Sequence, residues 1–263
     1  MVDIHSHLLP GIDDGAKDLN EAVTMAEMAA ADGATDIFLT SHLNFEYKYD
    51  PDMAARLRTK LASRSPIIRL HSGCEVHLTW EHIQLVLQNP AAYTLGGKRY
   101  LLVELPDQFL WQSIRAALEI LSDAGLRVVI AHPERNPQLR AEVNVAQEIV
   151  ESGYLMQITA RSLTGGFGPE SAGAAEHFLQ RQLVHFVASD AHSVTHRKPL
   201  LSPAHAHLSE RFGIEAAELL TRTNGLAILN DFPVRPMRRP SGSSLRFFAP
   251  TMRRILGLSA SRG

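Results

Sequence analysis

Short apolar runs alternate along the chain with longer segments in which apolar residues recur at the helical period. Each run has the length of a buried strand, and each longer segment has the single apolar face of an amphipathic helix. The predicted strands are residues 2–5, 36–40, 67–72, 99–103, 127–131, 154–159 and 184–188. The predicted helices are residues 18–33, 54–62, 81–87, 112–124, 142–152, 171–181 and 214–223, and an apolar run at 226–229 ends the pattern.

This regular alternation of strands and helices predicts an α/β fold with a parallel sheet. Because the repeats follow one another without a break in composition, we expect a single domain, a closed or nearly closed barrel, over residues 1–230. The 263 residues, of which 45% are hydrophobic, are enough to bury one large core.

Composition excludes several classes of protein. The formal net charge of −2 argues against a nucleic-acid-binding protein, because such proteins neutralise phosphates with an excess of basic residues. The single cysteine, Cys74, allows no intramolecular disulfide and indicates a reducing compartment. The N-terminus lacks the pattern of a signal peptide, and no apolar run approaches the ~20 residues of a membrane helix. We therefore predict a cytoplasmic location.

The charge is uneven, because the chain from Phe232 to its end carries seven arginines and no acidic residue. Four prolines and many small residues separate these arginines. We interpret residues 231–263 as a basic, flexible extension of the barrel. The alternative is a docking segment for an anionic membrane surface or for an acidic segment of a kinase.

Histidines and carboxylates stand where the predicted strands end. In an α/β barrel these ends meet on one face, where catalytic groups gather. Only the sixth strand lacks such a residue. Alone, the His5-x-His7 pair would be a weak signal, but its repetition at the other strand ends predicts a metal site. The candidates are His5, His7, His42, Glu75, Glu104, His132, Asp190 and His192.

The number of candidate ligands indicates a centre of two or three divalent ions that share a bridging carboxylate. Because no thiolate is among them, manganese, iron or zinc is favoured over a structural zinc site. Such a centre lowers the pKa of a bound water to about 7 and binds the oxygens of a phosphoryl group. The sequence therefore predicts a hydrolase, with a phosphoester as the favoured substrate.

The order of these motifs resembles that of the polymerase-and-histidinol-phosphatase (PHP) superfamily. Within it, the opening DIHSHLLPGIDDGAKD and the HPER tetrad resemble the bacterial protein-tyrosine phosphatases of capsule and exopolysaccharide operons. The resemblance runs from Met1 to about Asn230. The matching motifs are His5-Ser6-His7, Thr40-Ser41-His42, Gly73-Cys74-Glu75, Glu104-Leu105-Pro106, His132-Pro133-Glu134-Arg135 and Ser189-Asp190-Ala191-His192.

The resemblance implies a distorted seven-stranded barrel that holds up to three metal ions, commonly manganese. It also implies hydrolysis of phosphotyrosine in the tail of a polysaccharide-copolymerase tyrosine kinase. In this pattern the first ion is held by His5, His7, Glu75 and Asp190, the second by Asp14, His42 and His192, and the third by Glu75, Glu104 and His132. Asp13 could serve in place of Asp14. The resemblance further implies that Arg135 binds the phosphate and that Arg197 helps it.

Other functions stay open from the sequence. A small-molecule phosphatase of the histidinol-phosphatase type or a phosphodiesterase would use the same ligands. An amidohydrolase often needs a bridging lysine where this chain has Glu104, and a non-catalytic metal-binding protein would have lost a ligand. Cys74 is unsuited to nucleophilic catalysis, because Trp80 stands where a cysteine-dependent phosphatase needs arginine. The loops also hold aromatic residues that could flank a phenyl ring, namely Phe45, Tyr47, Tyr49, Phe109 and Trp111.

Overall fold

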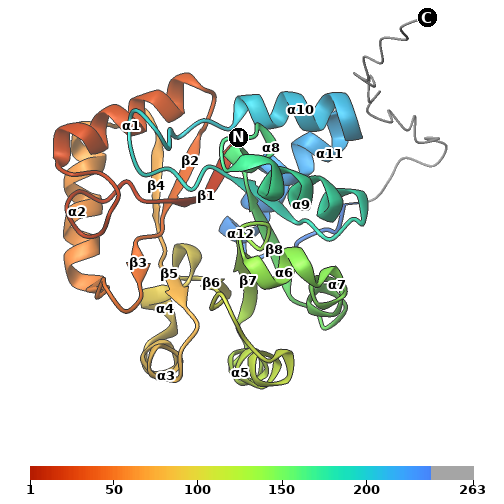
Figure 1. Cartoon of the computed structure of the whole chain (residues 1–263). Coiled ribbons are helices and arrows are strands. Elements are labelled where there is room, and N and C mark those ends of the chain that lie inside the picture. Colours follow the sequence, from red (N-terminus) through yellow and green to blue (C-terminus); the bar gives the residue numbers. More distant parts are fainter. Residues whose placement is uncertain (238–263) are drawn as a thin grey trace, which may run out of the picture.

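A computed structural model describes residues 1–237 as a barrel of parallel strands surrounded by helices (Figure 1). Seven strand positions make up the barrel, and two of them are each divided into two short strands. The strands are β1 (Val2–Ser6), β2 (Asp36–Leu39), β3 (His42–Leu43), β4 (Arg69–Ser72), β5 (Glu75–His77), β6 (Tyr100–Glu104), β7 (Arg127–Ala131), β8 (Leu155–Thr159) and β9 (Phe186–Ala188). The predicted α/β barrel is confirmed.

Two sheets share the barrel wall. One has the order β1-β2-β4 and the other the order β3-β5-β6-β7-β8-β9, and every named pair is parallel. The barrel closes where the chain after β9 returns to β1. There Ser6 bridges Ala191, Asp190 N donates to His5 O at 2.8 Å, and His7 N donates to Ala191 O at 2.8 Å. Closure therefore brings the first and last motifs of the chain together.

The second and third strand positions differ from the sequence prediction. The strand predicted at 36–40 ends at Leu39 and resumes as β3, and the one predicted at 67–72 resumes as β5. At the first break the Thr40 hydroxyl accepts from Ser6 N at 3.0 Å and replaces regular ladder pairing. At the second break Gly73 allows close packing, because a Cβ there would lie only 3.0 Å from Thr40 and Leu95 side-chain atoms. His42 and Glu75 thus begin short strands and do not simply follow long ones.

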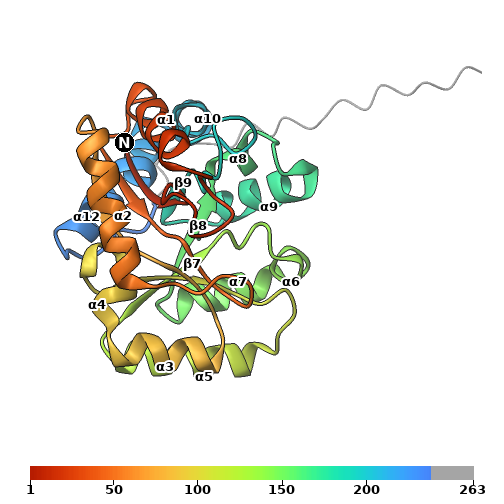
Figure 2. The ribbon, with the colours of Figure 1, turned by 90° about the vertical axis from the view of Figure 1, so that its left-hand side faces the viewer.

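Helices cover the outside of the barrel, and Figure 2 shows α3 and α5 side by side at one edge. Asp18 caps the first helix by accepting from Asn20 N and Glu21 N, as its sequence pattern predicts. The helices are α1 (Leu19–Ala31), α2 (Pro51–Arg64), α3 (Trp80–Gln88), α4 (Pro90–Tyr93), α5 (Trp111–Asp123), α6 (Pro137–Ala141), α7 (Val143–Glu151), α8 (Ala160–Leu163), α9 (Gly168–Gln180), α10 (Ser202–Phe212), α11 (Ile214–Glu218) and α12 (Asn224–Leu229), with single turns η1 (Leu95–Gly97) and η2 (Leu219–Thr223).

Two apolar cores support the barrel. The larger one lies between strands and helices, as alternate strand residues such as Leu101, Val103 and Ile130 show. The other residues of the same strands, with Phe38 and Phe186, form a second cluster that fills the interior. This interior packing gives the metal-ligand candidates a rigid floor.

The described chain ends on the barrel. Arg99 pairs with Asp231 at 2.9 Å, and Tyr100 OH donates to Phe232 O at 2.7 Å. The predicted basic extension, residues 231–263, is described only as far as residue 237, so most of its arginines lie outside the described residues. Among the helices described, none is long and apolar enough to cross a membrane.

Candidate metal centre

Glu75 lies at the centre of the predicted ligands. Its Oε2 is 3.2 Å from His5 Nε2 and 3.0 Å from His42 Nδ1, and its Oε1 is 2.7 Å from His132 Nε2. The side chain is completely buried. One carboxylate thus faces imidazoles from three different barrel positions, which suits a ligand that bridges metal ions.

The first motif supplies two imidazoles to this centre. His5 Nε2 and His7 Nε2 lie 3.1 Å apart, and they lie 3.4 and 3.5 Å from Asp190 Oδ1. Atoms of His5, His7 and Glu75 could together contact one ion, and so could atoms of His5, His132 and Asp190.

A second group lies at the outer side of His7. Asp14 Oδ1 is 3.4 Å from both His42 Nε2 and His192 Nε2. Candidate ligand atoms of His7, Asp14, His42 and His192 lie within 4.8 Å of one another. Asp14 is about half-exposed whereas His192 is buried, so this group opens toward solvent.

Glu104 completes a third group with His42 and Glu75. Its Oε1 is 3.8 Å from His132 Nε2, and its Oε2 is 3.1 Å from His77 Nδ1. The structure therefore brings together all nine residues that the sequence analysis named as metal ligands. His205 and His207, which repeat the His-x-His spacing on α10, contact Thr221 and Glu176 instead.

The donor set fits divalent cations. Three buried ligand atoms lie close to other ligand atoms but form no well-directed hydrogen bond among the described residues, namely Glu75 Oε2, His42 Nδ1 and His192 Nε2. Buried polar atoms are normally paired, and divalent ions bound at these ligand groups would pair them. Nitrogen and oxygen donors without sulfur suit manganese, iron or zinc.

The pKa values of the ligands reflect this concentration of charge. Burial alone would lower the pKa of His5, but the charges of Glu75 and Asp190 raise it to about 9. In the same way burial is outweighed at His42, whose pKa Glu75 and Asp14 raise to about 11. Burial would raise the pKa of Glu75, but the surrounding imidazoles hold it well below its usual range.

Further contacts orient the imidazoles of the first motif. His5 Nδ1 lies 2.8 Å from Gln157 Oε1 in β8, and His7 Nδ1 lies 2.8 Å from Asp13 Oδ2. Asp13 also accepts from the backbone N–H groups of Gly15 and His42, at 3.0 and 3.1 Å. Of the two neighbouring aspartates, Asp14 faces the ligand atoms and Asp13 supports His7.

Two arginines lie beside the centre. Arg135 Nη1 and Arg197 Nη2 both contact Asp190 Oδ2, the latter at 2.6 Å. Both guanidinium groups are about one-quarter exposed. A hollow of about 120 Å³, lined by Glu104, His132 and Arg135 among others, opens here. An anion in this hollow would meet the guanidinium group of Arg135 beside two candidate ligands, Glu104 and His132.

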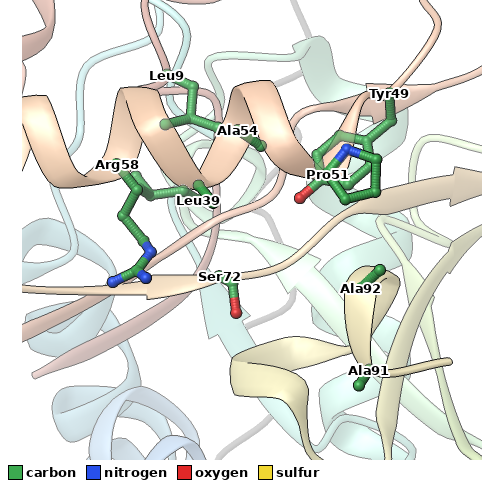
Figure 3. Close-up of a pocket in the computed structure, with 10 residues that line it drawn as sticks. Leu9, Leu39, Tyr49, Pro51, Ala54, Arg58, Ser72, Ala91 and Ala92 are labelled. Atoms are coloured by element: carbon green, nitrogen blue, oxygen red, sulfur yellow. The ribbon is translucent and has the colours of Figure 1, made fainter. Parts of the chain in front are cut away.

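The predicted aromatic residues separate into two sets. Tyr47 stacks on His42, with ring centroids 6.0 Å apart, and Phe45 packs edge-on against His77 at 5.2 Å. Tyr49 instead packs against Tyr93 and lines a different cavity, of about 200 Å³, between α2 and α4 (Figure 3). Phe109 and Trp111 are half-buried against the outer core. Of these five aromatic residues, Tyr47 packs on a candidate ligand, His42, and Phe45 packs on His77, which contacts Glu104.

Sequence reasoning missed two side chains that shape the site, Gln157 and Phe167. Gln157 is fully buried in an apolar strand, and a polar residue in such a run is a signal that could have been followed. Phe167 follows Gly166 in a loop and carries no comparable signal.

The family model for capsular polysaccharide synthesis proteins, CpsB/CapC, matches residues 1–230. The chain belongs to the CpsB/CapC family. The resemblance seen in the motifs is thereby confirmed. Among relatives of this CpsB/CapC chain, tyrosine-protein phosphatase YwqE of Bacillus subtilis is 32% identical over 91% of this chain and 97% of its own length. Tyrosine-protein phosphatase CpsB of Streptococcus agalactiae is 30% identical over 88% of this chain and 99% of its own.

Solved structures agree with this family assignment. The CpsB/CapC chain matches a structure from a study of YwqE of Bacillus subtilis and CpsB of Streptococcus pneumoniae, described as metal-dependent tyrosine phosphatases. That match has a TM-score of 0.83 at 31% identity and covers 91% of this chain and 98% of the other. A lactonase of Listeria monocytogenes, 12% identical with a TM-score of 0.52 over 89% of this chain and 92% of its own, shares the fold alone.

Proposed function

We propose that this protein is a metal-dependent protein-tyrosine phosphatase of capsule or exopolysaccharide synthesis. The observation that carries the proposal is the buried cluster around Glu75 with Arg135 and Arg197 beside it. Membership of the CpsB/CapC family and the names of the relatives support it.

We assign two to three divalent ions, with manganese favoured, to the nine candidate ligands in the pattern that the family resemblance implies. One ion falls to His5, His7, Glu75 and Asp190, a second to Asp14, His42 and His192, and a third to Glu75, Glu104 and His132. Bound ions would supply Lewis acidity and an activated water. The side chains of the centre are already converged and mostly buried, so little reorganisation is needed on loading.

The chain itself would bind and orient the phosphoryl group. Arg135 and Arg197 present guanidinium groups that suit phosphate oxygens, and Asp190 holds both from one side. Tyrosinate, with a reference pKa of about 10, is a better leaving group than a serine alkoxide. A site without a dedicated strong acid can therefore cleave a phenyl ester more readily than an alkyl one. Phe45 and Tyr47 could flank the phenyl ring.

We infer that the substrate is the tyrosine-rich tail of a polysaccharide-copolymerase tyrosine kinase, and that the reaction takes place in the cytoplasm. The basic segment from residue 231 onward could contact an anionic membrane surface near such a kinase. Removal of residues 238–263 should then weaken binding to the kinase and leave hydrolysis of a small aryl phosphate intact. Loss of turnover on the small substrate would contradict this docking role.

The test compares a phosphotyrosine peptide with a phosphoserine peptide and with histidinol phosphate, with manganese and after chelation. Manganese-dependent release from phosphotyrosine alone, abolished in His132→Ala, is the expected result. Metal content by mass spectrometry and the melting temperature of the variant show that the loss is local. Hydrolysis of histidinol phosphate alone would contradict the proposal and favour a small-molecule phosphatase.

A further inference from the structure

Three guanidinium groups surround the ring of Phe167. The Cζ atom of Arg135 lies 4.6 Å from the ring centroid, and those of Arg161 and Arg197 each lie 5.7 Å from it. All three distances are within the ~6 Å range of a cation–π contact. Phe167 immediately precedes α9, on the connection that follows β8. This is the strand position that supplies no predicted metal ligand.

Three guanidinium groups so close together repel one another. A site that binds an anion needs these groups restrained while their N–H donors stay free for the anion. Asp190 holds Arg135 and Arg197 through its Oδ2 on one side. The ring of Phe167 attracts the same groups through its face and accepts no N–H hydrogen bond in doing so. It therefore restrains the guanidinium groups while leaving their donors available to an oxyanion.

The orientation of the Arg197 guanidinium group is not fixed by its ion pair with Asp190 alone. Its Nε is buried and has no hydrogen-bond partner among the described residues. Its Nη2 is held by Asp190 at 2.6 Å. The ring of Phe167, 5.7 Å from Arg197 Cζ, adds a contact that limits how the planar group turns.

The loop that carries Phe167 is fixed to the HPER motif. Glu134, the residue before Arg135, accepts from Thr159 N at 2.9 Å and from Ser162 Oγ at 2.7 Å. The turn that follows closes through Gly166 N, which donates to Arg161 O at 2.9 Å. A Cβ on Gly166 would lie 2.2 Å from Arg161 Nε, so a larger residue there would displace the Arg161 side chain. The HPER motif thus supplies Arg135 and also Glu134, which anchors the segment that carries Phe167.

We infer that Phe167 is a positioning residue that keeps Arg135 and Arg197 oriented for the phosphoryl group. The inference rests on the proposed function, in which these arginines bind that group. The attraction comes from the face of the aromatic ring, so an aliphatic side chain of similar size should not hold the two arginines in the same way. Arg161, held by the same ring, adds positive charge at the edge of the site.

The test compares Phe167→Leu, which removes the aromatic face, with Phe167→Tyr, which keeps it. Phe212→Leu makes the same change at the last residue of α10, where Phe212 packs against the larger apolar core. The readouts are KM and kcat on a phosphotyrosine peptide, binding of inorganic phosphate by calorimetry to the manganese-loaded protein, metal content and melting temperature.

We expect Phe167→Leu to raise KM and to weaken phosphate binding by roughly 3- to 30-fold. Metal content should be unchanged, and Phe167→Tyr and Phe212→Leu should behave as the parent protein does. Equal KM and phosphate affinity in Phe167→Leu and the parent would overturn the inference. So would a loss in Phe167→Leu that Phe167→Tyr shares.

Failure of the proposed function gives a different pattern. A parent protein that hydrolyses no phosphotyrosine peptide contradicts the phosphatase assignment. Phosphate binding still decides the role of the ring in that case, because weaker binding in Phe167→Leu alone supports it and unchanged binding refutes it.

Discussion

The amide oxygen of Gln157 lies 2.8 Å from Nδ1 of His5, and both side chains are fully buried. An amide oxygen can only accept, so this contact places a proton on Nδ1 and leaves Nε2 of a neutral imidazole free to bind a metal ion. Gln157 comes from β8, the strand position without a predicted ligand. The barrel therefore uses this position to orient a ligand.

Replacing Gln157 with leucine should weaken manganese binding by roughly 10- to 100-fold, because partners of metal-bound histidines have effects of this size. The ligand itself remains, so excess manganese should restore much of the activity. Manganese titrations followed by phosphatase activity would measure the shift. Gln147→Leu on α7, which interacts with Glu151 at the surface, is the control and should leave the titration unchanged. An unshifted titration in Gln157→Leu would contradict the orienting role.

The two neighbouring aspartates should respond differently to the same change. Asp14 faces His42 and His192, so Asp14→Asn should reduce the number of ions bound at saturation. Asp13 contacts His7 Nδ1 and two backbone N–H groups, so Asp13→Asn should keep the number of ions and lower their affinity. Metal content at increasing manganese concentration separates the outcomes. The opposite pattern would show that Asp13 is the ligand.

The sequence predicted those parts of the molecule that depend on local pattern and chemistry. Strand positions and the cap at Asp18 follow from periodicity and residue type, and the convergence of the candidate ligands follows from their places at strand ends and from the family resemblance. The divided strands do not, because the breaks depend on how Thr40, Gly73 and Leu95 meet in three dimensions. The contact of Phe167 with Arg135 and Arg197 is equally tertiary, since these arginines follow β7 and β9 whereas Phe167 follows β8.

Loading of the centre should release protons. In the absence of metal, Glu75 and its neighbours raise the pKa of His5 to about 9 and that of His42 to about 11. Both imidazoles are therefore doubly protonated and cationic at pH 7.5. A metal ion needs the neutral imidazole, and binding must displace these protons. Manganese affinity should therefore rise with pH between 7 and 9.

Calorimetry in two buffers of different ionisation enthalpy measures the protons released. We expect at least one proton per protein molecule at pH 7.5 and weaker binding at pH 6.5. His42→Asn should release fewer protons than the parent protein. A binding heat independent of the buffer would show that the imidazoles are already neutral.

His185 should make stability depend on pH at a place remote from the metal ligands. Burial lowers its pKa to about 4, and its Nδ1 accepts a hydrogen bond from Met156 N at 3.2 Å. In the unfolded chain the His185 imidazole becomes protonated below about pH 6.5, whereas in the folded chain it becomes protonated only below about pH 4. The free energy of unfolding should thus fall as pH falls through this window, by roughly 2–4 kcal/mol from this group alone.

His185→Asn tests this dependence, because the amide can accept the same hydrogen bond and does not titrate. Urea unfolding with chelator at pH 7.5 and 4.5 gives the stability difference between the parent protein and the variant at each pH. Moving to pH 4.5 should shift that difference in favour of the variant by roughly 2–3 kcal/mol, since only the parent loses stability through this imidazole. The same change at the exposed His196 should leave the difference constant. A constant difference for His185→Asn as well would mean that the folded protein accepts the proton at position 185 as readily as the unfolded chain does.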